Sequence, residues 1–133
     1  MSISASNKMA TCMAVTDQGA VCVSLAGDVD LAAEPDLASL ADNLAAMRCS
    51  VVHIDLGKIR FAGSSLVKFL FRLARQLPGQ ATINLCRPDA MTLQLIELTG
   101  LHEVATVRPD LPADWVALCA AAVEPHALQT TAG

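Results

Sequence analysis

The chain has 133 residues, a formal net charge of -4 at pH 7 and 53% hydrophobic residues. This length favours one domain with a full core, and the negative charge argues against a nucleic-acid partner. No stretch approaches the ~18 uninterrupted apolar residues of a membrane-spanning helix. The first residues also lack the apolar segment of a signal peptide. We therefore expect a cytoplasmic protein without membrane insertion.

The first half of the chain predicts a hairpin followed by a helix and a buried strand. Residues 1–9 are small and polar, which favours a flexible terminus. Residues 12–16 and 21–25 alternate as strands do, and Gly19 supplies a turn between them. Residues 27–30 are expected to leave the sheet. Glu34 and Pro35 then begin a helix, and the apolar run 51–56 predicts a central strand.

The second half alternates helices and strands. A helix is expected from Ser64 or Ser65 to Pro78. A strand over 81–85, a helix from Asp89 to Leu98 that Gly100 ends, a strand over 104–107 and a helix over 110–123 follow. The order ββαβαβαβα predicts a single α/β domain over residues 10–124. It has a mixed, mostly parallel sheet of four to five strands packed with four to five helices, and a flexible tail over 125–133.

The helix that begins at the two serines is apolar over a wide arc. Lys68, Arg72 and Arg75 share the opposite side, and Val67 and Phe71 stand at the edge of the arc, beside this basic strip. These two apolar residues fit either the flank of the core or a docking surface. The strip belongs to a segment, 56–88, with six basic residues and no acid, whereas 17–42 has six acids and no base. Such asymmetry can steer a partner.

Motifs for catalysis are weak. Ser65 and Lys68 fit the S-x-x-K pattern of serine acyl-transfer enzymes, but the companion motifs S-D-N and K-T-G are absent. No nucleotide-binding glycine loop occurs either. Asp28 and Asp30 are two residues apart without further metal ligands nearby, and Asp55 is expected to accept hydrogen bonds from loop N–H groups. We therefore expect no enzyme, no metal and no cofactor.

The five cysteines are scattered and form no C-x-x-C pair. In a reducing compartment they are expected to act as small buried apolar residues. Cys12 and Cys119 lie near the chain ends and are the ones most expected to be accessible.

Three segments resemble the STAS domain, the module of sulphate transporters and anti-sigma factor antagonists. VCVSLAGDVDLAAEPDL (21–37) resembles the G-[DE]-[LV]-D turn after the second strand of that family. VVHIDLGKIRFAGSSLVKFLFRL (51–73) is similar to its central D-L and F-[IM]-D-S-S-G-L segment, and 88–107 resembles its third helix and T-G-L. The resemblance covers about residues 10–110.

This resemblance implies a protein-binding domain of a bacterial anti-anti-sigma factor. Such a protein binds an anti-sigma factor that is an ATP-binding serine kinase, and binding releases a sigma factor. The kinase phosphorylates the second serine of D-S-S-G, which corresponds to Ser65 beside Ser64, and a phosphatase restores it. Asp28 and Asp30 are then expected in loops beside Ser65. The partner-binding residues that follow are Asp28, Asp30, Gly63, Ser64, Ser65, Leu66, Val67, Lys68, Phe71 and Arg72.

Two positions depart from the family pattern. The chain has Gly63 where the family has Asp, and Leu66 where it has Gly. Both changes alter the surroundings of Ser65 and leave a second interpretation open, in which Ser64 and Ser65 only cap the helix. Control by another signal, such as thiol oxidation, also stays open. An alternative function is a non-phosphorylated STAS subunit of another assembly, such as a lipid or membrane transport complex or a stress-sensing scaffold.

Overall fold

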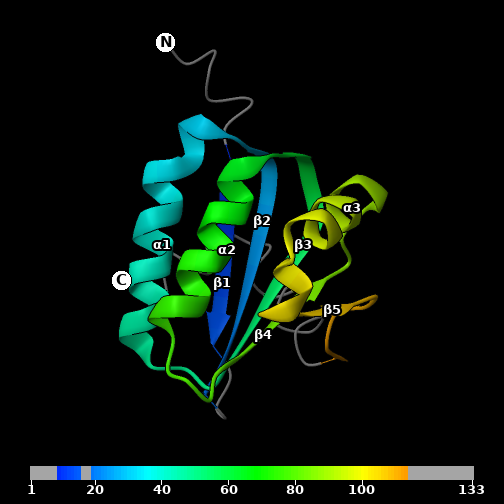
Figure 1. The fold of residues 1–133 in the computed structure, drawn as a ribbon. Coiled ribbons are helices and arrows are strands. Elements are labelled where there is room, and N and C mark those ends of the chain that lie inside the picture. Colours follow the sequence, from blue (N-terminus) through cyan, green and yellow to red (C-terminus); the bar gives the residue numbers. More distant parts are fainter. Residues whose placement is uncertain (1–8, 16–18, 114–133) are drawn as a thin grey trace.

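The computed structural model describes residues 9–15 and 19–113. They form a five-stranded sheet in the order β1-β2-β3-β4-β5 (Figure 1). β1 and β2 are antiparallel, and β2, β3, β4 and β5 are parallel. The strands are β1 (Ala10–Val15), β2 (Ala20–Val29), β3 (Val51–Ala62), β4 (Thr82–Cys86) and β5 (Thr106–Arg108). The predicted mixed, mostly parallel α/β sheet is confirmed.

Three α-helices, α1 (Glu34–Met47), α2 (Ser64–Gln76) and α3 (Ala90–Thr99), occur in the described residues, where four to five helices were predicted for the chain. Two short 3-10 turns, η2 (Leu31–Ala33) and η3 (Leu101–Glu103), accompany them. The helix predicted over 110–123 lies, beyond Ala113, outside the described residues. The helix count is therefore lower than predicted within the part that the structure covers.

The ends of the helices follow the local sequence. Pro35 lies in the first turn of α1, where its missing N–H group costs nothing, and Glu34 and Asp36 stand at the positive end of the helix dipole. Asp89 caps α3 by accepting a 2.7 Å hydrogen bond from the Thr92 backbone N–H. Gly100 ends α3 with a φ of 79°, a left-handed conformation that glycine adopts without strain.

The three helices lie on one face of the sheet (Figure 1). Alternate residues of β2, β3 and β4 point to that face, and Val23, Ile54 and Leu85 are fully buried there with Leu44 of α1 and Leu73 of α2. The opposite face has a different composition. Its residues are more polar and also buried: Cys22, Ser24, Asp55, Asn84 and Cys86.

β2 and β3 are longer than the sequence indicates. Residues 27–30 were expected to leave the sheet, yet β2 continues to Val29 and β3 continues to Ala62, through two shifts of register. The prediction was wrong because main-chain pairing persists where the alternating side-chain pattern does not. The two strand ends pair with each other beyond the part of β3 that pairs with β4. We call residues 27–29 and 56–62 the arm.

Candidate functional site

Helix α2 begins where the arm ends. Gly63 is the residue before the first turn, and its backbone N–H donates to the Val29 carbonyl over 3.4 Å. Because Gly63 has no side chain, the helix has no side-chain cap. Ser64 and Ser65 lie inside the first turn instead. The interpretation of the two serines as helix caps is therefore wrong.

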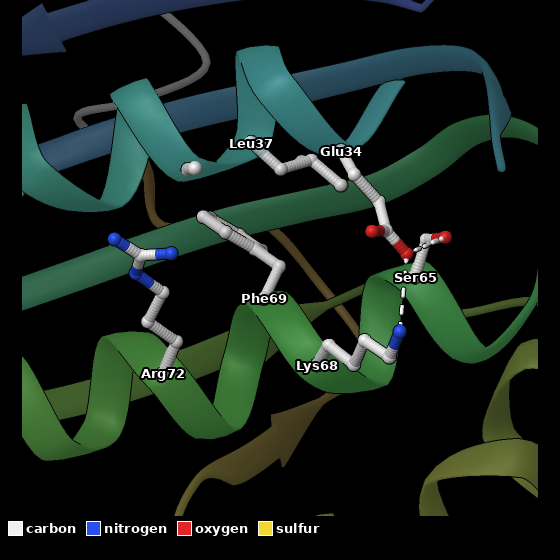
Figure 2. Close-up of a pocket in the computed structure, with 7 residues that line it drawn as sticks. Glu34, Leu37, Ser65, Lys68, Phe69 and Arg72 are labelled. Atoms are coloured by element: carbon white, nitrogen blue, oxygen red, sulfur yellow. Dashed lines mark hydrogen bonds and ion pairs between the residues drawn. The ribbon is translucent and has the colours of Figure 1, made fainter. Parts of the chain in front are cut away.

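Ser65 is 4% exposed and faces α1. Its Oγ donates a 2.8 Å hydrogen bond to Glu34 Oε2, and Lys68 Nζ reaches the same oxygen over 3.5 Å (Figure 2). The Ser65 hydrogen bond lowers the pKa of Glu34, and the positive charge of Lys68 adds to this effect, although partial burial opposes it. Glu34 is therefore an ionised carboxylate with two donors at neutral pH.

The contact between α1 and α2 continues one to two turns further along. Asp42 of α1 accepts a 2.9 Å hydrogen bond from Gln76 and pairs with Arg72 over 3.3 Å. The hydrogen bond from Gln76, followed by the charge of Arg72, lowers the pKa of Asp42. The basic side of α2 and the acidic side of α1 thus face each other. Acidic residues of the first half of the chain therefore pair with basic residues of the second half within the same domain.

A groove of about 110 Å³ lies along this contact. Ser65, Lys68 and Arg72 line it from α2, and Glu34 and Leu37 line it from α1 (Figure 2). Figure 2 shows Ser65 and Lys68 at the Glu34 end and Arg72 at the other end. The groove places one hydroxyl, one carboxylate and two cations around a small space. Both cations are paired with carboxylates, Lys68 with Glu34 and Arg72 with Asp42.

Other predicted site residues gather at the same end of the molecule. Asp28 lies in β2 rather than in a loop, opposite Phe61, and pairs with Arg60 over 3.3 Å. Asp30 accepts a 3.1 Å hydrogen bond from the Ala32 N–H and so caps η2. Ser64 is exposed at the start of α2. The expected loop position is therefore wrong for Asp28 and correct for Asp30.

Three apolar residues proposed for partner binding contact the core. Leu66 is fully buried, so its side chain is not available on the surface of this structure. Val67 and Phe71 are half-buried and pack against the core cluster. This packing agrees with the core-flank interpretation of Val67 and Phe71, and a docking role for their exposed parts stays a prediction.

Gly63 does not require glycine for its conformation. Its φ of -130° is extended backbone that any residue adopts. A Cβ atom at this position would meet the Phe61 ring at 3.5 Å, which is an ordinary contact. The Asp of the family pattern would therefore fit here, and its replacement changes the charge near the serines without changing the backbone.

Sequence reasoning missed an apolar groove of about 230 Å³ between the arm and α3. Phe61 contributes from the arm, and Met91, Leu95 and Leu98 contribute from α3. Phe61, Met91 and Leu98 are 54%, 81% and 77% exposed. Met91 and Leu98 are seven residues apart, which places them on one helical face, so the spacing was visible in the sequence. The groove could not be predicted because the sequence does not show that the arm lies beside α3.

Glu34 was also missed as a site residue. Its place in the first turn of a helix has an ordinary electrostatic explanation, and 30 residues separate it from the serines along the chain. Only the packing of α1 against α2 reveals its contact with Ser65. No local pattern would have shown it.

Asp55 forms a second carboxylate cluster on the opposite face of the sheet. It is 1% exposed and accepts a 2.9 Å hydrogen bond from the Gly57 N–H. This donor lies within β3, whereas a donor in a loop was expected. Arg87 adds a bidentate pair, with Nε at 3.0 Å and Nη2 at 2.8 Å. Gly57 allows the guanidinium to approach, because a Cβ there would lie 2.7 Å from Arg87 Nε.

Within the part of the chain that the structure describes, neither the cysteines nor the Ser65–Lys68 pair shows a catalytic arrangement. Cys22, Cys49 and Cys86 are buried, and burial, with the charge of Asp55, raises the pKa of Cys86 to about 11. Such a thiol reacts poorly with oxidants. Cys12 is partly exposed, and Cys119 lies outside the described residues. Lys68 and Ser65 both donate to Glu34, so neither is placed to take a proton from the other.

Among residues 9–15 and 19–113, no three His, Cys, Asp or Glu side chains are grouped as a metal site requires. No helix in the same described ranges is both long and apolar enough to cross a bilayer.

The family model described as MlaB, STAS domain, matches residues 12–109. The chain belongs to the STAS domain family. This match confirms the resemblance found in the sequence and covers most of the described fold. The predicted domain limits of 10–124 extend beyond it at both ends and stay a prediction. A search of curated proteins finds no match.

Solved structures with the same fold include two anti-sigma factor antagonists, one of them in two forms. One from Mycobacterium paratuberculosis is 23% identical, with a TM-score of 0.72 over 84% of this chain and 94% of that one. Unphosphorylated SpoIIAA is 15% identical, with a TM-score of 0.65 over 81% and 93%. Phosphorylated SpoIIAA from Bacillus is 15% identical, with a TM-score of 0.63 over 81% and 96%. At these identities, the likeness is one of fold.

Proposed function

We propose that this STAS domain is a bacterial anti-sigma factor antagonist. It binds an anti-sigma factor and so releases a sigma factor. The observation that carries the proposal is the gathering of an exposed apolar groove and two helix-start serines at one end of the molecule. Exposed apolar surface of this kind is typical of protein-binding sites. Two proteins with this fold are anti-sigma factor antagonists, one of them known in two forms, which supports the same role here.

The proposed contact surface combines the arm with the start of α2 and the exposed side of α3. Phe61 and Met91 supply apolar anchors, and Ser64 and Asp28 supply polar groups at the rim. An apolar centre with a polar rim is the usual composition of a protein interface. A domain that acts by such contacts is a binding protein and needs no catalytic group of its own.

We further propose that the anti-sigma factor is an ATP-binding serine kinase and that Ser65 is its phosphorylation site. Ser65 Oγ forms a bond to the γ-phosphorus of ATP, the bond to the ADP oxygen breaks, and the hydroxyl proton passes to a base of the kinase. A phosphatase reverses the modification by hydrolysis. The phosphate adds a charge of about -1.5 to -2 at the start of α2 and so weakens the complex.

A second candidate is a non-phosphorylated STAS subunit of another assembly, such as a transport complex. The observation that favours it is the environment of Ser65, which is buried and hydrogen-bonded to a carboxylate. A kinase must first open this contact. Gly63 and Leu66, where the family pattern has Asp and Gly, point the same way. In this function the same surface binds its partner permanently.

The test is affinity capture from a lysate of the source organism, followed by reconstitution. Wild type is compared with Phe61→Ser, which removes an anchor of the proposed surface. Met47→Ser is the matched control, because Met47 is also exposed but lies at the far end of α1. The proteins retained by wild type and Met47→Ser, and lost with Phe61→Ser, are identified by mass spectrometry. Each captured protein is then purified in complex with its own binding partner for reconstitution with this chain.

The expected result is an ATP-binding anti-sigma factor that releases its sigma factor when this chain is added. Phe61→Ser removes a side chain that the partner would cover in the complex, and this loss is expected to weaken binding about tenfold or more. Capture of transporter or scaffold subunits through the same surface overturns the antagonist function and supports the second candidate. Equal binding of Phe61→Ser and wild type overturns the proposed surface.

A further inference from the structure

A phosphate on Ser65 meets an obstacle in this chain. Ser65 is 4% exposed, and its hydroxyl points at the Glu34 carboxylate, 2.8 Å away. A phosphoserine has no hydroxyl proton to donate and carries a charge of about -1.5 to -2 at neutral pH. The present contact would therefore become a repulsion between like charges. Any phosphorylated form must replace it with a different set of contacts.

We propose that the groove between α1 and α2 is the receptor for this phosphate, and that Lys68 exchanges Glu34 for it. This inference rests on the proposed phosphorylation of Ser65. The phosphate occupies the groove of about 110 Å³ beside Ser65, and the Lys68 ammonium pairs with its oxygens. Glu34 loses both of its donors and turns toward solvent. Phosphorylation thus changes the charge pattern of α1 as well as that of α2.

Lys68 is suited to this exchange by its present contact. Its Nζ lies 3.5 Å from Glu34 Oε2, which is longer than a close charged hydrogen bond, and its side chain is 69% exposed. An exposed ion pair of this kind is weak, so little is lost when it opens. Lys68 also follows Ser65 by three residues, which places the two side chains on the same side of α2. A phosphate has more charge and more acceptors than a carboxylate and attracts the ammonium more strongly.

Arg72 lines the same groove but is not expected to bind the phosphate. It is paired with Asp42, which Gln76 also holds. Figure 2 places its guanidinium at the opposite end of the groove from Ser65. Seven residues on one helix correspond to a rise of roughly 10 Å. Arg72 is therefore the matched control for Lys68, a cation of the same groove with a different carboxylate partner.

The displaced Glu34 stands in the first turn of α1, just after Asp30 and η2. Its side chain is 32% exposed in the present contact, so it can turn outward without unfolding the helix. A free carboxylate then appears beside the start of α2, which belongs to the proposed partner surface. The modification would in this way repel an acidic partner surface from two positions.

The experiment uses the full chain with phosphoserine incorporated at position 65 during translation, without any partner. Melting temperatures and ³¹P chemical shifts are measured for the phosphorylated and unphosphorylated forms. Each form is made in four versions: wild type, Glu34→Gln, Lys68→Gln and Arg72→Gln. A chain with phosphoserine at the exposed position 64 controls for charge alone. The charged groups that line the groove are Glu34 and Lys68 beside Ser65 and Arg72 further along, and Arg72 is paired with Asp42.

The expected result is a reversal of sign at Glu34. Glu34→Gln lowers the melting temperature of the unphosphorylated form slightly and raises that of the phosphorylated form by several degrees. Lys68→Gln lowers the melting temperature of the phosphorylated form and raises the second pKa of its phosphate, followed by the ³¹P shift against pH, relative to the wild-type phosphorylated chain. Arg72→Gln changes both forms equally.

Two outcomes overturn the inference. Equal effects of Lys68→Gln and Arg72→Gln on the phosphate pKa would mean that the groove contributes only a diffuse field. If Glu34→Gln lowers the melting temperatures of both forms, Glu34 keeps its present contacts after phosphorylation. Both outcomes are independent of any partner. A phosphorylated chain that behaves as expected here, but binds no anti-sigma factor, would contradict the proposed function and leave the phosphate receptor standing.

Discussion

Two carboxylates in this molecule each bind one cation and one further donor, yet their surroundings differ. Asp55 is 1% exposed and holds Arg87 through two hydrogen bonds of 2.8 and 3.0 Å. Glu34 is about a third exposed and holds Lys68 at a single distance of 3.5 Å. The first cluster joins β3 to the end of β4, and the second joins two helices at the surface. Similar residue types thus produce one fixed contact and one exchangeable contact.

The difference follows from solvent. A buried carboxylate that loses its partner cannot be rehydrated, so the contact must be kept. A surface carboxylate that loses its partner is hydrated at once, so its contact can be exchanged at small cost. Arg87 also matches a carboxylate with two parallel donors, whereas an ammonium such as that of Lys68 acts as a point charge. The permanence of an ion pair is therefore set by burial and geometry before it is set by charge.

The largest expected effect is that of Asp55→Ala. It removes the acceptor of Arg87 and of the Gly57 N–H, so unfolding should become easier by about 3 kcal/mol. Chemical denaturation followed by circular dichroism measures this. Asp36→Ala, at an exposed acid of α1, is the control and should cost at most about 1 kcal/mol, because this carboxylate only loses its interaction with the helix dipole. If Asp55→Ala changes the free energy of unfolding only slightly, the Asp55 contact is no more fixed than that of Glu34.

Gly57→Ala is expected to have an intermediate effect. The new Cβ would lie 2.7 Å from Arg87 Nε, so the guanidinium must move and its hydrogen bonds to Asp55 weaken, at a cost of about 1 to 2 kcal/mol. The same substitution in an Arg87→Ala background should cost much less, because the crowding group is gone. A double-mutant cycle of unfolding free energies measures the coupling. Equal costs in both backgrounds would show that Gly57 is needed for another reason.

The smallest expected effect is that of Glu34→Gln on the unphosphorylated chain. The Ser65 hydrogen bond, followed by Lys68, lowers the pKa of Glu34 from 4.5 in the folded state. A lowered pKa stabilises the fold above the unfolded value, and this contribution disappears as the pH falls through the folded pKa. The small difference in melting temperature between wild type and Glu34→Gln should therefore be present at pH 7 and vanish at acidic pH. A difference that persists below the folded pKa would contradict an ionised Glu34.

Much of the fold was predictable from the sequence because its signals are local. Pro35 and Gly100 mark helix ends through their own backbone preferences, and Asp89 caps its helix through a neighbour three residues away. The alternation of residues 21–25 and the apolar run 51–56 place two strands correctly. These features need no knowledge of distant contacts.

The site was less predictable because its contacts join distant parts of the chain. The Ser65 hydroxyl meets Glu34 only through the packing of α1 on α2, so its hydrogen bond was missed and a cap was considered instead. Phe61 is exposed because β3 continues past the end of its pairing with β4, which the side-chain pattern does not show. Leu66 was assigned to the surface from its place in a motif, although the helix turns it into the core.

The arm separates the residues that bind a partner from the residues that keep the domain folded. Among the described residues, its strand segments, 27–29 and 56–62, pair with each other and extend past the register of β4. Phe61, near its tip, faces solvent, so a substitution there changes the outer surface and leaves the packing under the helices intact. Duplicated copies of such a domain can diverge at this position and acquire separate partners in one cell. The same core can then serve several signalling routes without cross-talk.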